Sequence, residues 1–143
     1  DNPNNVFVGG FIGTPAMNFI HGKIDTKGNF VAEGVSVKVP EARIKKLEEK
    51  GYKGKEVILG IRPEDIHDEQ VVLETYKDAI VDFKVDVAEL LGAETNIYAR
   101  VGNNDVVARV DARADIKIKD TIKLAFDMNK VHFFDVDTEE RIR

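Results

Sequence analysis

Hydrophobic and polar residues alternate in several short stretches of the chain, the pattern of strands that bury one face. Alternation occurs at residues 35–39, 81–87, 95–101 and 122–127. In the second stretch it predicts that Val81, Phe83, Val85 and Val87 all face the core. Residues 57–61 form a continuous apolar run instead, which is typical of a strand buried on both faces. The chain is therefore rich in short strands.

Turn signals separate these strands. Residues 26–29 and 102–105 have the Gly and Asn content of hairpin turns, and residues 91–93 predict a bend between two strands. Residues 41–50 predict an interior helix that turns Ile44 and Leu47 inward, and Pro63 begins a single helical turn. Many short strands with few helices predict a mainly β fold, closed or nearly closed into a barrel.

The first residues predict a short N-terminal helix at 3–12, which ends before Pro15. Its apolar face is formed by Phe7, Val8, Phe11 and Ile12. The chain begins without Met or a signal segment, and we expect it to be a piece of a longer protein. We therefore divide it into a tail of residues 1–14 and a barrel domain of residues 15–143.

Composition and charge limit the classes of function that are compatible with the chain. The 143 residues suit one domain, and the absence of cysteine excludes disulfides and thiolate metal sites. The net charge is −5, and residues 61–90 hold nine acids against three bases, which does not suit a nucleic-acid surface. The basic residues of 41–60, Arg43 among them, alternate with glutamates, so we expect a solvated helix face.

No catalytic, cofactor-binding or metal-binding residues are predicted. The chain lacks a phosphate-binding P-loop, and its one serine has no flanking glycine elbow. His21, His67 and His132 are widely spaced and are expected as unconnected surface or turn residues. Asp82 and Asp86 share a strand face, where we expect solvated charges rather than an acid/base pair. Residues 135–140 lack the glycine that a calcium loop needs.

Four segments together resemble a known family. They are FVGGFIGTPAMNF (7–19), LGIRPEDI (59–66), VAELLGAET (87–95) and HFFDVDT (132–138). Their order and spacing are similar to those of the C-terminal regulatory domain, called TOBE, in ATP-binding subunits of bacterial sugar ABC importers of the maltose and multiple-sugar type. The chain differs at Lys119-Asp120, where the family usually has Gly-Asp, and at Gly10, where alanine is common.

The resemblance implies OB-like barrels that do no chemistry and that pair with the same domain of a second ATPase subunit. It also implies that ATP and magnesium bind in a separate nucleotide-binding domain, which would cover the apolar helix face. Further partners would be membrane permease subunits and, in some members, a regulatory protein. The location implied is cytoplasmic, at the inner face of the cell membrane.

The best candidate for a site is the corner formed by Arg62, Glu64 and Asp65. An arginine ends the apolar run there, and two carboxylates follow at a helix start. We expect either an Arg–carboxylate pair that fixes the corner or a contact with another subunit.

Two other functions are compatible with a small barrel: an OB-type nucleic-acid binder and a small-ligand-binding barrel. The negative charge and the scarcity of aromatic residues beside basic strands argue against the first. No motif supports the second.

Overall fold

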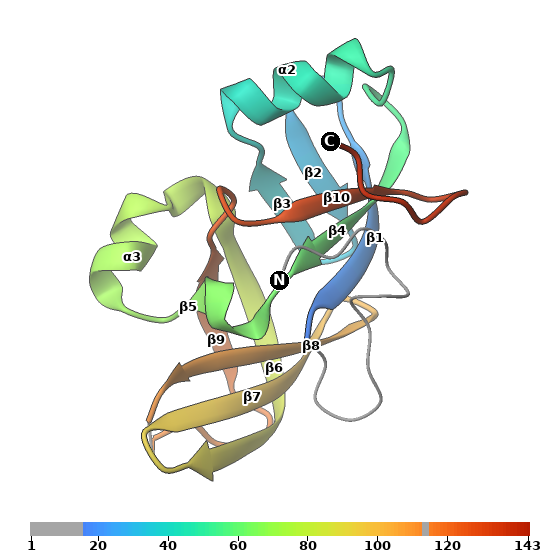
Figure 1. The fold of residues 1–143 in the computed structure, drawn as a ribbon. Coiled ribbons are helices and arrows are strands. Elements are labelled where there is room, and N and C mark those ends of the chain that lie inside the picture. Colours follow the sequence, from blue (N-terminus) through green and yellow to red (C-terminus); the bar gives the residue numbers. More distant parts are fainter. Residues whose placement is uncertain (1–15, 113–114) are drawn as a thin grey trace.

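The structure is a computed structural model that describes residues 16–112 and 115–143 (Figure 1). Its strands are β1 (Asn18–Ile24), β2 (Asn29–Ala32), β3 (Val35–Lys38), β4 (Glu56–Ile61), β5 (Ile66–His67), β6 (Ile80–Leu91), β7 (Glu94–Val101), β8 (Asn104–Asp111), β9 (Thr121–Phe126) and β10 (His132–Asp135). Its helices are α2 (Glu41–Glu49), α3 (Gln70–Thr75) and the 3-10 turns η1 (Pro63–Asp65) and η2 (Lys77–Ala79). The predicted tail, with its apolar helix face, lies outside the described residues.

Two five-stranded antiparallel sheets make up the described fold. The first has the order β10-β4-β1-β2-β3, and the second has the order β5-β9-β6-β7-β8. Strand β4 has neighbours on both sides, and its residues from Val57 to Ile61 are all buried. This confirms the prediction made from the apolar run at 57–61.

The second sheet curls until its edge strands, β5 and β8, come into contact. The turn η1, which leads into β5, also packs against β8. A curled sheet hides the backbone groups of its edges, which would otherwise stay unpaired. This nearly closed sheet confirms the predicted mainly β, barrel-like fold.

One hydrophobic core joins the two sheets. Phe30 and Leu59 of the first sheet belong to the same packed cluster as Phe83 and Phe126 of the second, and all four are fully buried. Helix α2 lies across one end of the first sheet (Figure 1) and adds Leu47 to this core, as predicted. Neither helix of the described part is long and apolar enough to span a membrane.

Asn18, the first residue of β1, links the sheets through its side chain. Its Nδ2 donates to the carbonyl of Ile61 on β4 (3.1 Å) and to that of Val107 on β8 (2.9 Å). Its Oδ1 accepts a hydrogen bond from the backbone N–H of Val107 (2.8 Å). Because Asn18 is only 3% exposed, water cannot replace these bonds. The side chain therefore binds β8 as a neighbouring strand would.

A second junction joins the turn between β2 and β3 to the turn between β7 and β8. Gly102 has a φ of 59°, and a Cβ there would collide with the backbone of Glu33. Asn103 Nδ2 also donates to Glu33 Oε2 (2.6 Å). Only glycine fits at position 102, because both the space and the φ exclude larger residues.

The alternation at 81–87 gave one wrong prediction. Val81, Phe83 and Val85 are buried, but Val87 is 50% exposed. The pairing of β6 with β7 shifts between Val85 and Val87, which is a β-bulge. The extra residue turns the following side chains to the opposite face.

Lys119 lies in the turn before β9, at the place where the chain departs from the Gly-Asp of the resembled family. Its φ is 74°, a left-handed conformation that favours glycine. The turn is closed by the N–H of Asp120, which donates to the carbonyl of Lys117 (3.1 Å), and the N–H of Lys119 donates to the carbonyl of Val85 on β6 (2.7 Å). The lysine therefore keeps a conformation that costs it free energy.

We predict that Asn18→Ala lowers the free energy of unfolding by about 2–4 kcal/mol, because Val107 would keep a buried N–H and a buried C=O without partners. Urea denaturation followed by circular dichroism measures the change. The control is Asn103→Ala, at an exposed hydrogen bond, which should change the free energy by less than about 0.5 kcal/mol. Equal losses in the two variants would contradict the role given to Asn18.

We also predict that Lys119→Gly raises the free energy of unfolding by about 1 kcal/mol, since glycine adopts a left-handed φ at little steric cost. The same denaturation measurement applies. Lys117→Gly, two residues earlier and without a left-handed φ, should give no gain. A Lys119→Gly protein no more stable than the parent would show that the turn is not strained.

Candidate functional site

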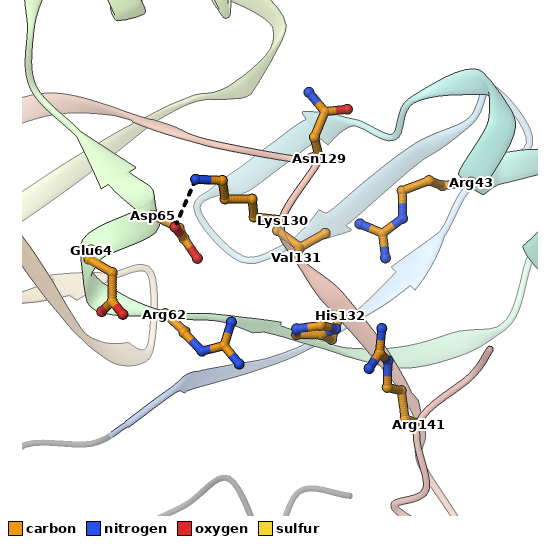
Figure 2. A pocket seen from close by; sticks show the side chains of 9 residues that line it. All are labelled: Arg43, Arg62, Glu64, Asp65, Asn129, Lys130, Val131, His132 and Arg141. Atoms are coloured by element: carbon orange, nitrogen blue, oxygen red, sulfur yellow. Dashed lines mark ion pairs between the residues drawn. The ribbon is translucent and has the colours of Figure 1, made fainter. Parts of the chain in front are cut away.

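A pocket of about 390 Å³ opens to the surface near the end of β4 and the start of β10 (Figure 2). Four separate parts of the chain form its wall: helix α2, the junction of β4 with η1, residues 129–132, and the segment after β10. The predicted corner of Arg62, Glu64 and Asp65 lies on this wall, and the complete lining is Arg43, Arg62, Glu64, Asp65, Asn129, Lys130, Val131, His132 and Arg141.

The carboxylates of the corner form ion pairs with residues from other parts of the chain and not with Arg62. Residues 63–65 form the predicted single helical turn, η1, directly after Arg62. Glu64 Oε1 lies 3.8 Å from Nη1 of Arg109 on β8, and Asp65 Oδ1 lies 3.9 Å from Lys130 Nζ. In the described residues, no carboxylate forms an ion pair with Arg62. These ion pairs connect the corner to β8 and to the loop before β10. Arg62 takes no part in them, and its side chain lines the pocket.

His132 is a buried residue of the pocket lining. It is only 6% exposed, so the prediction of a surface or turn residue is wrong. Strand β10 pairs it with Gly60 of β4 and places its ring against Phe134, which removes it from solvent. Neither ring nitrogen has a hydrogen-bond partner among the described residues. Burial, and then the positive charges of the surrounding arginines, lower the pKa of His132 to about 4, so the ring is neutral at neutral pH.

Arg43 also differs from its prediction. It is half-buried rather than part of a solvated helix face. Its Nη1 donates to the carbonyl of Met128 (3.1 Å), and its guanidinium carbon lies 5.5 Å from the centre of the Phe133 ring, within cation–π range. Burial, followed by the charge of Arg141, lowers the pKa of Arg43. Helix α2 therefore contributes a cation to the pocket.

Arg141 lies in the segment that folds back along β10, where it forms an isolated bridge with Phe134. Its Nη1 is buried without a hydrogen-bond partner in the part of the chain that the structure describes. Burial, and then the charges of Arg143 and Arg62, lower the pKa of Arg141. The pocket therefore concentrates guanidinium groups whose charges repel one another.

The remaining sequence candidates do not join this site. Asp82 Oδ1 lies 2.8 Å from Lys123 Nζ, and both side chains are exposed on the second sheet. This agrees with the expectation of solvated charges. Among the described residues, no group of three or more His, Cys, Asp or Glu side chains could hold a metal ion. The chemistry that the pocket offers is hydrogen-bond donation from guanidinium groups.

Comparison with models of protein families shows the family of this chain. A model of the MalK OB fold domain matches residues 13–66, and a model of the TOBE domain matches residues 59–134. The chain therefore belongs to the TOBE domain family, which confirms the resemblance found in the sequence. The two matches overlap at residues 59–66, which include Arg62 and the start of the pocket wall.

Curated relatives agree with this family. The chain is 58% identical over 99% of its length to the oligosaccharides import ATP-binding protein MsmX of Bacillus subtilis. It is 47% identical over its whole length to the multiple sugar-binding transport ATP-binding protein MsmK of Streptococcus mutans, and 42% identical to the putative uncharacterized ABC transporter ATP-binding protein YcjV of Escherichia coli. It spans only 38% of the length of each of these relatives.

The buried histidine leads to a pH prediction. The folded-state pKa of His132 is about 4, below the unfolded value of about 6.5, so the unfolded chain takes up the proton first as the pH falls. The contribution of His132 to stability is therefore complete above pH 6.5 and is lost towards pH 4, a change of about 3 kcal/mol.

Urea denaturation between pH 7.5 and pH 4 in chloride buffers measures this change. His132→Gln should remove about 3 kcal/mol of the acid destabilisation, and His21→Gln, at an exposed position, should remove none. An imidazole of His132 that titrates near pH 6.5 in NMR spectra of the folded protein would refute the prediction.

Proposed function

We propose that this chain is the regulatory and dimerisation domain of the ATP-binding subunit of a carbohydrate ABC importer, and that it is not itself catalytic. The observation that supports this most directly is the similarity to MsmX and MsmK, whose names describe sugar import or transport and ATP binding. In this proposal the full-length subunit couples ATP hydrolysis to sugar uptake. The domain described here positions two copies of the subunit.

The proposal assigns the remaining chemistry to other parts of the transporter. ATP and magnesium would bind in a nucleotide-binding domain outside this chain. Membrane permease subunits would bind that domain and hold the assembly at the cytoplasmic face of the membrane. The proposal includes a regulatory protein as a further partner of the domain, and it excludes nucleic acid because the net charge is −5.

An exposed apolar surface supports pairing with a second copy. At the end of the β6–β7 hairpin, Val87, Leu90 and Leu91 are 50%, 58% and 49% exposed. Val87 and Leu91 lie on one face of β6 and Leu90 lies on the other, and we call these three residues the hairpin patch. Burying such side chains gives roughly 1.5–3 kcal/mol each, which is enough to stabilise a contact. Figure 1 shows this hairpin at the end of the molecule away from α2.

In the part of the chain that the structure describes, the backbone of β6 beside the hairpin patch pairs with another strand on one side only. Strand β6 pairs with β9 only at residues 80–84, and Val85 bonds the loop before β9. Beyond Val85, β7 is the one strand that pairs with β6 among the described residues. An unpaired strand edge beside apolar side chains is a surface on which a second strand can dock. A twofold arrangement of two such edges would pair the copies with each other.

We predict that the chain is in a monomer–dimer equilibrium and that Leu90→Glu with Leu91→Glu raises the dissociation constant at least about tenfold. Sedimentation equilibrium at several protein concentrations measures the constant. Val71→Glu is the control, because Val71 is 68% exposed on α3 and lies outside the hairpin patch.

Deleting residues 1–12 completes the test, because the apolar face predicted there could associate by itself. The proposal expects the dimer to persist without these residues. A parent chain that stays monomeric at millimolar concentration, or a dimer lost on this deletion but not with the two leucine changes, would contradict it.

A further inference from the structure

The arginines of the pocket come from three separate elements and share one space. Arg43 comes from α2, Arg62 from the junction between β4 and η1, and Arg141 from the segment after β10. Figure 2 shows their guanidinium groups turned towards the ring of His132. Cations brought together from distant parts of the chain repel one another, so the fold maintains this arrangement at a cost.

The negative charge on the pocket wall does not balance these groups. Glu64 lies beside Arg109, and Asp65 lies beside Lys130. In the described residues, Arg43, Arg62 and Arg141 have no carboxylate within ion-pair distance. His132 does not compensate either, because a neutral ring carries no charge.

Buried hydrogen-bonding atoms of the pocket are also unsatisfied. Nη1 of Arg141 and both ring nitrogens of His132 are buried, and none has a hydrogen-bond partner among the described residues. His132 itself is 94% buried. A buried polar atom without a partner costs about 1–3 kcal/mol, so such atoms are rare in a folded protein unless something else binds them. Arg141 Nη1 and the protonated ring nitrogen of His132 are donors, so these two atoms indicate a missing acceptor at the cavity.

We propose that this pocket binds a phosphate group, either inorganic phosphate or the phosphate of a small monoester, through Arg43, Arg62 and Arg141. A guanidinium group carries five N–H donors in a planar fork that matches pairs of phosphate oxygens. A carboxylate presents two oxygens in one plane, which a single fork satisfies, whereas a tetrahedral phosphate presents oxygens towards donors from several directions. The pocket volume of about 390 Å³ leaves room for a small organic group on the phosphate.

The remaining donors agree with this ligand. Arg43 uses one donor on the carbonyl of Met128 and keeps its others. The unpartnered Nη1 of Arg141 and the imidazole N–H of His132 supply two more. The site is independent of the proposed pairing surface, because it lies at β4 and β10 and not at the β6–β7 hairpin.

The test is an NMR titration of the ¹⁵N-labelled chain with sodium phosphate, glycerol 3-phosphate and sodium acetate at constant ionic strength in chloride buffer. We expect saturable shifts of the amides of residues 62, 64, 65 and 130–132 with phosphate or its ester, at a Kd of about 1 mM or below. A lower Kd for the ester supports the proposal with an ester as the ligand. An equal or lower Kd for inorganic phosphate supports it with free phosphate as the ligand.

Variants separate this site from general attraction to positive charge. Arg62→Gln and Arg141→Gln should each raise the Kd at least about tenfold. Arg100→Gln is matched in charge and removes an exposed arginine of β7 that lies 3.4 Å from Asp105, so it should change the Kd less than about twofold. Amide spectra of each variant report its fold. If Arg141→Gln unfolds, Arg62→Gln, at a half-buried position, decides the test.

Three results would overturn the proposal. The first is the absence of saturable shifts at the pocket. The second is acetate binding as strongly as phosphate, which would show a site without preference for a tetrahedral anion. The third is an Arg100→Gln effect as large as that of Arg62→Gln.

Discussion

The side-chain amide of Asn18 is the contact on which the arrangement of the two sheets depends. It exchanges two hydrogen bonds with the backbone of Val107 and donates a third to Ile61, and all three are buried. A strand neighbour would satisfy Val107 in the same way, so the first sheet continues into the second through one side chain. The shared core supplies most of the burial but is not directional, whereas this bond pattern permits only one placement of β8.

The pocket is a consequence of that placement. Ile61, whose carbonyl Asn18 holds, is followed directly by Arg62, and η1 then packs against β8. Glu64 forms an ion pair with Arg109, and Asp65 forms one with Lys130. Arg62 therefore has no carboxylate partner in the described part of the chain and shares the pocket with Arg141 and the neutral ring of His132. The electrostatic repulsion among these cations lowers the stability of the protein, and the rest of the fold compensates for it. Such locally unfavourable arrangements are common at ligand-binding sites.

The sequence predicted those parts of the fold that follow a periodic pattern. The strand at 35–38 and the inner face of α2 were predicted because their side chains repeat with the period of the element, and the strand at 57–61 was predicted from its continuous apolar run. The exposure of Val87 was not predicted, because the bulge depends on how β6 pairs with β7. Helix α3 was not predicted either, because none of its residues is fully buried. The corner at 62–65 was found, but its partners, including the buried His132, come from segments far apart in the sequence. Only the fold brings them together.

The central claim is that Asn18 joins the two sheets into one cooperative unit. Native-state hydrogen exchange of the Val107 amide tests it most directly, because β8 is an edge strand of its sheet and this amide donates to Asn18 Oδ1 rather than to another strand. The account predicts that Val107 exchanges only by global unfolding, with the same free energy as the slowest amides of β4 and β6. Exchange of Val107 with a free energy several kcal/mol lower, as in a fraying edge, would contradict it.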